Sequence, residues 1–96
     1  MSERVVLLAG AGTPLGQELA RQLAAQGWRV ALNDLLPTRV QPLAEEIAAA
    51  GGQAIAAAAD LTRKLALQIM LQGVLEHWGR VDALVLIPSV QPEGNV

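Results

Sequence analysis

Three glycines near the N-terminus and an aspartate further along the chain have the types and spacing that a nucleotide-binding site uses. Gly10, Gly12 and Gly16 follow a short apolar run, and Asp34 ends a second one, 18 residues after Gly16 (34 minus 16). Glycines allow a tight turn whose backbone approaches a pyrophosphate at the start of a helix. A carboxylate about 20 residues further on accepts hydrogen bonds from ribose hydroxyls. The spacing favours a dinucleotide site over the alternative, in which the glycines only make a tight turn.

Asp34 also bears on which dinucleotide the site would prefer. Its carboxylate can accept hydrogen bonds from both ribose hydroxyls and would repel a 2′-phosphate, so the sequence predicts NAD as the cofactor in preference to NADP. Arg39 lies nearby in the sequence and could partly relax that preference. The alternative for Asp34 is a solvated acid in a loop.

The residues on either side of the glycines must form a strand, a helix and a second strand. Residues 5–9 and 29–34 are short apolar runs typical of buried parallel strands. Between them we expect a helix from Pro14 to Gln26, capped by Thr13, with the proline at a position where no N–H is needed. The side chains expected to face the sheet recur at helical spacing and are Leu15, Leu19 and Leu23.

The rest of the chain continues the alternation of strand and helix. Because proline clashes inside a helix, Pro42 predicts a loose turn over residues 37–41 and a regular helix only from Pro42 to Ala50. Residues 53–59 are rich in alanine, but the double glycine before them and the aspartate after them favour a third strand. The last expected elements are a helix over residues 63–78, capped by Thr62, and a strand over residues 83–87.

Four repeats of this kind predict an α/β fold with a Rossmann-like, doubly wound parallel sheet. We expect about four strands in the order 3-2-1-4, with three helices and right-handed crossovers. Residues 1–88 would form one dinucleotide-binding domain, and Ser89–Val96, with Pro92 and Gly94, a short flexible tail.

Composition excludes several classes of protein. The chain has 96 residues, a net charge of -2 and two aromatic residues, so it lacks the basic field and the stacking platforms of a nucleic-acid-binding protein. No apolar run approaches the roughly 20 residues of a membrane span. The absence of cysteine excludes disulfides and thiol catalysis and is compatible with a cytoplasmic location, which we predict.

Four segments, in the right order, resemble the short-chain dehydrogenase/reductase family. Residues 9–16, Ala-Gly-Ala-Gly-Thr-Pro-Leu-Gly, are similar to the family's opening Thr-Gly-x-x-x-Gly-x-Gly, and Asp34 matches its second-strand acid. Residues 60–62, Asp-Leu-Thr, match its Asp-Val-Thr. Residues 78–85, Trp-Gly-Arg-Val-Asp-Ala-Leu-Val, match its Phe-Gly-x-Ile-Asp-x-Leu-Val. The resemblance covers the N-terminal half of the family fold and implies a fold truncated relative to a full-length member.

The resemblance implies further site residues and also shows departures. By it, Asp60 would bind the adenine amino group, with the Leu61 backbone beside it. Ala9 replaces the family's threonine, and residues 86–89, Leu-Ile-Pro-Ser, replace its Asn-Asn-Ala-Gly on the nicotinamide side. Pro14 replaces the middle glycine and removes one N–H from the phosphate cradle, whereas Leu15 keeps its own. The cofactor-binding residues predicted are Gly10, Gly12, Thr13, Leu15, Gly16, Asp34, Asp60 and Leu61.

The family's catalytic residues have no counterpart in this sequence. The resemblance would require a serine and a Tyr-x-x-x-Lys motif, and the chain contains no tyrosine. Three functions stay open: an NAD(H)-binding protein without the family's chemistry, a fragment of an NAD-dependent oxidoreductase, and a non-catalytic interaction subunit that has lost the cofactor. Titration with NADH distinguishes the first two from the third.

The last predicted strand and helix expose apolar surface. Residues 83–87 would form a sheet edge without a charged side chain, which is a liability in a monomer. Leu65 and Ile69 fall on the side of the 63–78 helix that points away from the sheet. The sequence therefore predicts a homodimer in which either the fourth strands or the 63–78 helices meet across a two-fold axis.

Overall fold

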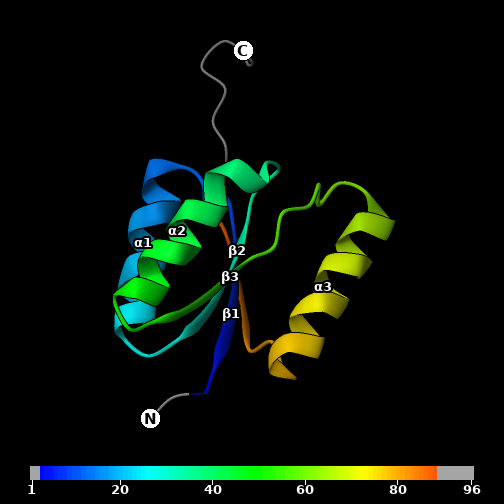
Figure 1. The fold of residues 1–96 in the computed structure, drawn as a ribbon. Helices are drawn as coiled ribbons and strands as arrows, with labels where there is room; N and C mark the ends of the chain where they lie inside the picture. Colours follow the sequence, from blue (N-terminus) through cyan, green and yellow to red (C-terminus); the bar gives the residue numbers. More distant parts are fainter. Residues whose placement is uncertain (1–2, 89–96) are drawn as a thin grey trace.

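The protein is an α/β layered domain, described here by a computed structural model that covers residues 3–88. A parallel four-stranded sheet has helices on both faces (Figure 1). The strands are β1 (Val5–Ala9), β2 (Arg29–Asn33), β3 (Gln53–Ala56) and β4 (Ala83–Leu86), in the order β3-β2-β1-β4. Helices α1 (Pro14–Ala25) and α2 (Pro37–Ala49) cover one face, and α3 (Lys64–Trp78) lies on the other. The predicted fold and strand order are confirmed; the predicted tail, residues 89–96, lies outside the described residues.

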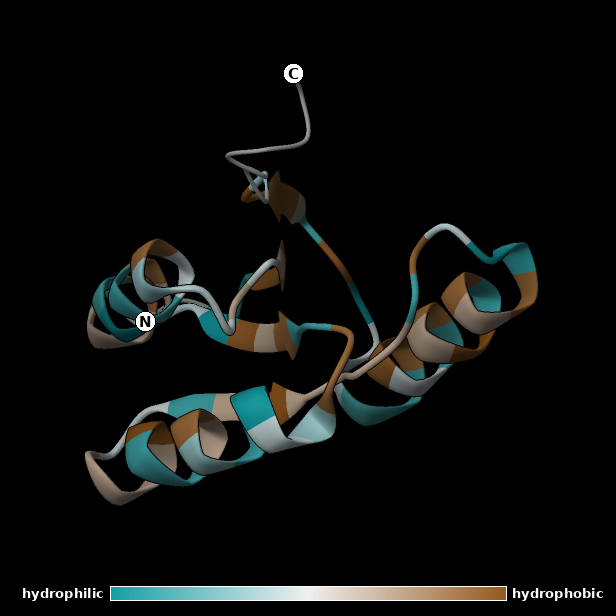
Figure 2. Ribbon diagram, turned by 90° about the horizontal axis from the view of Figure 1, so that it is seen from above, coloured by the Kyte–Doolittle hydropathy of each residue, from teal (hydrophilic) through white to brown (hydrophobic). Residues whose placement is uncertain are grey.

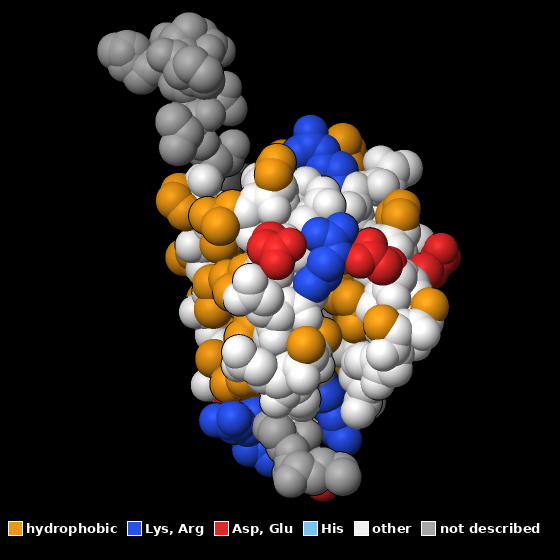
Figure 3. Space-filling view, turned by 90° about the vertical axis from the view of Figure 1, so that its left-hand side faces the viewer, with side chains coloured by type: hydrophobic (Ala, Val, Ile, Leu, Met, Phe, Trp, Pro, Cys, Tyr) orange, Lys and Arg blue, Asp and Glu red, His pale blue; other side chains and the backbone are white. Residues whose placement is uncertain are grey.

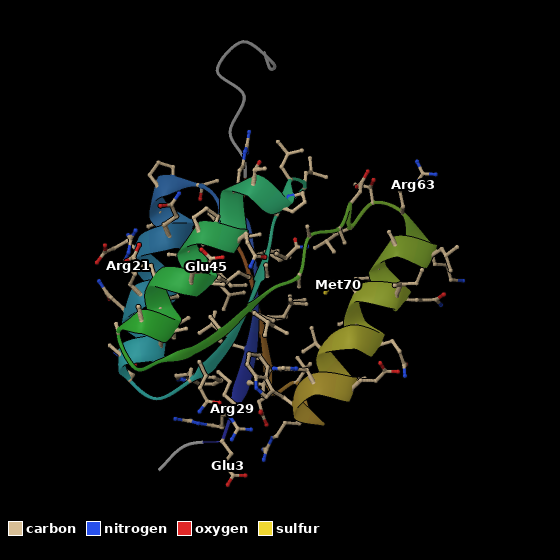
Figure 4. The ribbon with its side chains drawn as sticks, in the orientation of Figure 1. Glu3, Arg21, Arg29, Glu45, Arg63 and Met70 are labelled. Atoms are coloured by element: carbon tan, nitrogen blue, oxygen red, sulfur yellow. The ribbon has the colours of Figure 1, made fainter. Side chains whose placement is uncertain are left out.

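The two faces of the sheet form two separate halves of the core. Alternate residues of β1 point to opposite sides, so Val6 and Leu8 pack with the α1 and α2 side, whereas Val5 and Leu7 pack with the α3 side. Met70 is buried and points from α3 toward the sheet (Figure 4). Figure 2 shows the apolar residues of the strands enclosed between these layers. β1 is buried throughout, because it, like β2, has a neighbouring strand on each side and lies between helix layers.

The predicted loose turn over residues 37–41 is wrong. α2 begins at Pro37 and continues through Pro42, which stands inside the helix. Val40, in the segment expected to be irregular, is completely buried in the core. Burial of this side chain is worth about 2 kcal/mol, comparable with the roughly 3 kcal/mol that an interior proline costs. Packing of the first turn therefore offsets most of the cost of the proline.

Two local expectations also fail. Thr62 does not cap α3: Arg63 occupies the cap position without a side-chain bond, and the Thr62 hydroxyl donates instead to the Asp60 carboxylate at 2.6 Å. The carboxylate is a strong acceptor for this hydroxyl, so the threonine closes the turn before the helix, and the helix begins after Arg63. Leu15 does not face the sheet and is 65% exposed, because the first turn of α1 follows the end of β1.

The outer side of α1 and α2 is held by charged pairs. The Nε of Arg21 in α1 lies 2.6 Å from a carboxylate oxygen of Glu46 in α2, and Glu18 lies 3.7 Å from the same guanidinium. Acidic and basic side chains alternate across the middle of this face (Figure 3). Exposed pairs of this kind contribute little stability. Within residues 3–88, no helix is long and apolar enough to cross a bilayer.

Candidate nucleotide-binding site

The glycine turn links the end of β1 to the start of α1. Gly10 has a φ of 86°, which favours glycine, and its N–H donates to the Asn33 carbonyl of β2 at 3.0 Å. A Cβ on Gly16 would overlap the carbonyl oxygen of Gly10, so the helix can approach the turn only with glycine at this position. Thr13 caps α1 as predicted, since its hydroxyl accepts the Gly16 N–H at 3.0 Å.

The Asp34 carboxylate is turned toward this glycine turn. The side chain is buried, and its Oδ2 accepts the N–H of Gly12 at 3.1 Å. A Cβ on Gly12 would overlap that same oxygen, which explains why the turn needs a glycine here as well. The acid at the end of the second strand is therefore fixed against the start of the first helix, as the spacing predicts.

Arg39 of α2 stands on the outer side of Asp34. Its guanidinium lies 3.7 Å from Asp34 Oδ1, with just over half of its side chain exposed. At this distance the two groups form a loose ion pair, and the arginine is free to turn toward solvent. The positive charge expected from the sequence is therefore present beside the carboxylate.

Asp60 and Leu61 form the opposite side of the site, where the chain leaves β3. Asp60 Oδ1 accepts hydrogen bonds from both the N–H and the hydroxyl of Thr62, at 3.0 and 2.6 Å. These bonds, the hydroxyl first, hold the pKa of the Asp60 carboxyl below its usual value. Asp60 therefore carries a full negative charge at neutral pH, while Oδ2 keeps its acceptor capacity.

An open cleft of about 390 Å³ brings these two sides together at the carboxyl ends of the strands. In a doubly wound sheet this is where ligands bind, because the strand order reverses there. Leu15 and Gly16 do not line the cleft; Gly12 lines an adjoining hollow with Arg39. The predicted site residues that line the cleft are Gly10, Thr13, Asp34, Asp60 and Leu61.

A family model described as short chain dehydrogenase matches residues 4–95, almost the whole chain. The chain belongs to the short-chain dehydrogenase family. One relative, (2S)-[(R)-hydroxy(phenyl)methyl]succinyl-CoA dehydrogenase subunit BbsD of Thauera aromatica, is 32% identical over 88% of the chain and 34% of its own length. An uncharacterized oxidoreductase of Thermotoga maritima is 36% identical over 97% of the chain and 36% of its own length.

Solved structures of dehydrogenases share this fold. A metagenomic short-chain oxidoreductase in complex with NADP has a TM-score of 0.80 and 36% identity, over 88% of this chain and 38% of the other. An oxidoreductase of Haemophilus influenza with bound NAD has a TM-score of 0.84 and 27% identity, over 88% and 30% of the two chains. This chain spans about a third of the length of the curated relatives that it matches.

The start of α1 offers a reduced set of N–H donors for a pyrophosphate. The N–H groups of Thr13 and Gly16 have partners within the turn, and that of Gly12 donates to Asp34. Pro14 has no N–H, so in this turn the Leu15 N–H is the donor without a partner among the described residues. That donor and the positive end of a 12-residue helix suit an anionic oxygen. The residues present therefore fit the phosphate bridge of a dinucleotide.

Sequence reasoning missed Asn33, the last residue of β2. Its side chain is buried, and its amide Nδ2 donates to the carbonyls of Ala57 and Ala59 at 2.9 and 3.3 Å. Its own carbonyl accepts the N–H groups of Gly10 and Ala11. Asn33 thus ties both sides of the cleft to the same strand. The available signal was a single amide side chain after three apolar residues of β2, directly before Asp34, the aspartate predicted to bind the ribose.

Proposed function

We propose that this short-chain dehydrogenase chain binds NAD(H) in the cleft between the glycine turn and the Asp60 loop. The observation that carries the proposal is the Asp34 carboxylate, buried against the Gly12 N–H at 3.1 Å. A fixed carboxylate at the end of β2 can accept ribose hydroxyls without first being ordered. The NADP and NAD bound in the two similar structures support a nicotinamide dinucleotide as the ligand.

Each side of the cleft has a separate role in this proposal. The N-terminal end of α1, whose cap Thr13 lines the cleft and whose Leu15 N–H follows directly, would hold the pyrophosphate, and Asp34 the ribose. Asp60, ionised and at the cleft wall, would accept the adenine amino group, with the Leu61 backbone beside it. When bound, the nicotinamide supplies hydride transfer. The chain's own residues bind and orient it, since the sequence contains no tyrosine to donate the family's proton.

Replacement of Asp34 by alanine tests the site directly. We expect NADH to bind about tenfold or more weakly to Asp34→Ala, because a hydrogen bond to a charged group is worth about 1.5–3 kcal/mol. The preference for NADH over NADPH should also disappear, because the carboxylate that repels a 2′-phosphate is gone. Isothermal titration with each cofactor measures both effects.

Glu45→Ala, on the exposed side of α2, is the matched control and should bind NADH like the unmodified chain. An Asp34→Ala variant that is folded by circular dichroism and keeps the original NADH affinity would remove Asp34 from the site. Absence of NADH binding by the unmodified chain at millimolar concentration would contradict the function itself.

Arg39→Ala should change NADPH binding and leave NADH binding nearly unchanged. The guanidinium beside Asp34 is mostly exposed and can turn toward a 2′-phosphate, so its removal should weaken NADPH by about tenfold. Titration of both cofactors into Arg39→Ala and Arg39→Lys checks this, since lysine restores the charge without the planar fork. Equal NADPH affinities for all three proteins would show that Arg39 does not contribute to specificity.

The coverage of about a third of each relative favours a second candidate. In this second candidate, the chain is the nucleotide-binding portion of an oxidoreductase, and the proton donor belongs to a part of the enzyme outside this sequence. A Tyr-x-x-x-Lys motif in frame after Val96 in the source genome would support this candidate. A stop codon directly after Val96 would favour binding without the family's chemistry.

A further inference from the structure

Gln17, in the first turn of α1, reaches back to the glycine turn. Its side-chain amide Nε2 donates to the carbonyl oxygen of Gly12 at 2.9 Å, and the residue is half-buried. Gln17 lines the hollow beside the cleft, which Gly12 also lines, and does not line the cleft itself. The glutamine therefore contacts the turn from outside the space that would hold the dinucleotide.

Gly12 is held by hydrogen bonds on both sides of its Cα. Its carbonyl accepts the Gln17 amide, and its N–H donates to Asp34 Oδ2 at 3.1 Å. The peptide group between Gly12 and Thr13 is fixed at its other end as well, since the Thr13 N–H donates to the Gly10 carbonyl at 3.1 Å. The direction of the Gly12 N–H therefore depends on a peptide group that Gln17 helps to fix.

The turn needs this restraint because position 12 must be a glycine. A Cβ at this position would overlap Asp34 Oδ2. Glycine has more backbone freedom than any other residue, and it has no side chain whose packing would limit that freedom. The limit must come from hydrogen bonds to the backbone of Gly12, and the Gln17 amide makes one of them.

The Asp34 carboxylate has a competing partner on its other side. Its Oδ1 lies 3.7 Å from the Arg39 guanidinium and accepts the Leu36 N–H at 3.4 Å. If the Gly12 N–H turned away from Oδ2, the arginine would draw the carboxylate outward, because opposite charges attract at this distance. The bond from Gly12 therefore decides whether the carboxylate faces the glycine turn or the arginine.

We propose that Gln17 is a positioning residue for Asp34, acting through Gly12, and that it contributes to the preference for NAD over NADP. This role rests on the proposed function, in which Asp34 binds the ribose hydroxyls. The glutamine amide keeps the carboxylate directed at the glycine turn, where it accepts the ribose hydroxyls and repels a 2′-phosphate. Without the amide, the carboxylate turns toward Arg39 more often, so the ribose loses an acceptor and a 2′-phosphate meets less negative charge.

Gln17→Met removes the amide donor and keeps a side chain of similar length and helix propensity. We expect NADH to bind about fivefold more weakly, which is the effect of one net hydrogen bond. NADPH should bind no more weakly than before. Gln17→Ala should behave in the same way, because alanine also lacks the donor and favours a helix. Isothermal titration of both cofactors measures the affinities, and circular dichroism establishes that each variant is folded.

Gln22→Met is the matched control, because it removes the same amide group from the same helix. The Gln22 amide donates to the exposed carboxylate of Glu18 at 3.2 Å and not to the glycine turn. This variant should bind both cofactors like the unmodified chain. An equal loss of NADH affinity in Gln17→Met and Gln22→Met would overturn the proposal. A Gln17→Met variant that binds NADH as before, or that loses both cofactors to the same extent, would overturn it too.

Combination with Asp34→Ala distinguishes an effect through the carboxylate from a direct contact with the ligand. The double variant Gln17→Met/Asp34→Ala should bind NADH like Asp34→Ala alone, because the group that Gln17 positions is gone. A further loss of about fivefold in the double variant would show that Gln17 acts by another route, and the proposal would then be wrong.

Hydrogen exchange of the Gly12 amide, followed by NMR, tests the positioning step in the free chain. In Gln17→Met the Gly12 N–H should exchange about fivefold faster, because it leaves Asp34 more often. The Gly16 N–H, which the Thr13 hydroxyl accepts at 3.0 Å, should keep its rate. An unchanged Gly12 rate would contradict the proposal. If the unmodified chain bound no NADH, the proposed function would fail and the role in specificity with it, whereas the exchange rates would still decide whether Gln17 positions Gly12.

Discussion

Replacement of Gly16 by alanine should lower the melting temperature by about 15 °C. The added Cβ overlaps the backbone oxygen of Gly10 and lies 2.9 Å from the Cα of Ala11, and neither backbone atom can move aside without opening the turn. Overpacking of this kind costs about 3 kcal/mol, and about 1 kcal/mol shifts the midpoint by roughly 5 °C in a domain of this size. Thermal unfolding followed by circular dichroism measures the change.

Gly73→Ala is the matched control because it makes the same chemical change in another helix. Gly73 is exposed in the middle of α3, and a Cβ there meets no atom within 4 Å. Alanine should therefore stabilise the protein by about 0.8 kcal/mol through helix propensity. If both variants lost the same stability, the tight contact at Gly16 would not be the cause.

Asn33→Asp should be the most damaging single-atom change near the cleft. It replaces the donor that lies 2.9 and 3.3 Å from two carbonyl oxygens with an acceptor. A buried charge facing carbonyl oxygens should cost about 3 kcal/mol at neutral pH. NADH binding should weaken as well, because the segment before Asp60 loses its two bonds to the Asn33 side chain and keeps only its backbone bonds to Leu32 and Asp34.

The loss in Asn33→Asp should depend on pH in a definite direction. Burial and the facing carbonyls raise the pKa of the introduced carboxyl in the folded state above its unfolded value of about 3.9. The neutral form can donate one hydrogen bond, so the deficit is smallest below the unfolded pKa and grows as pH rises through the folded one. Asn33→Ala, which has no titrating group, should show a loss that is constant with pH. Urea unfolding, measured from below the unfolded pKa to neutral pH, gives the free energy of unfolding of both variants. The same pH dependence of this free energy in both would contradict the explanation.

Residue pattern was sufficient to predict the fold and the position of Asp34 beside the glycine turn. The short apolar runs, the glycines and Asp34 each have one local explanation that agrees with the others, and β1, α1 and β2 lie where the pattern predicts. The elements that differ are those decided by tertiary packing. Pro42 enters a helix because Val40 is buried, and burial of Val40 depends on strands that are distant in sequence.

The site shows the same division between local and distant causes. The spacing between the glycine turn and the acid is enough to identify Asp34, because both belong to one βαβ unit. No local rule finds the contacts of Asn33 with Ala57 and Ala59, which are 24 and 26 residues away. Thr62 was assigned as the cap by residue type, but its hydroxyl donates to the Asp60 carboxylate and the cap position falls on Arg63.

The attachment of both cleft walls to Asn33 has a consequence for how the cleft can move. The glycine turn, which forms one wall, is bound to the backbone oxygen of Asn33. The segment after β3, which forms the other wall, is bound to its side-chain amide. A fluctuation that frees either wall must disturb the end of the same strand, so the two are coupled and open together. The amide protons of Gly10, Ala11 and the residues after β3 should then exchange with solvent at similar rates, because one opening motion exposes them all.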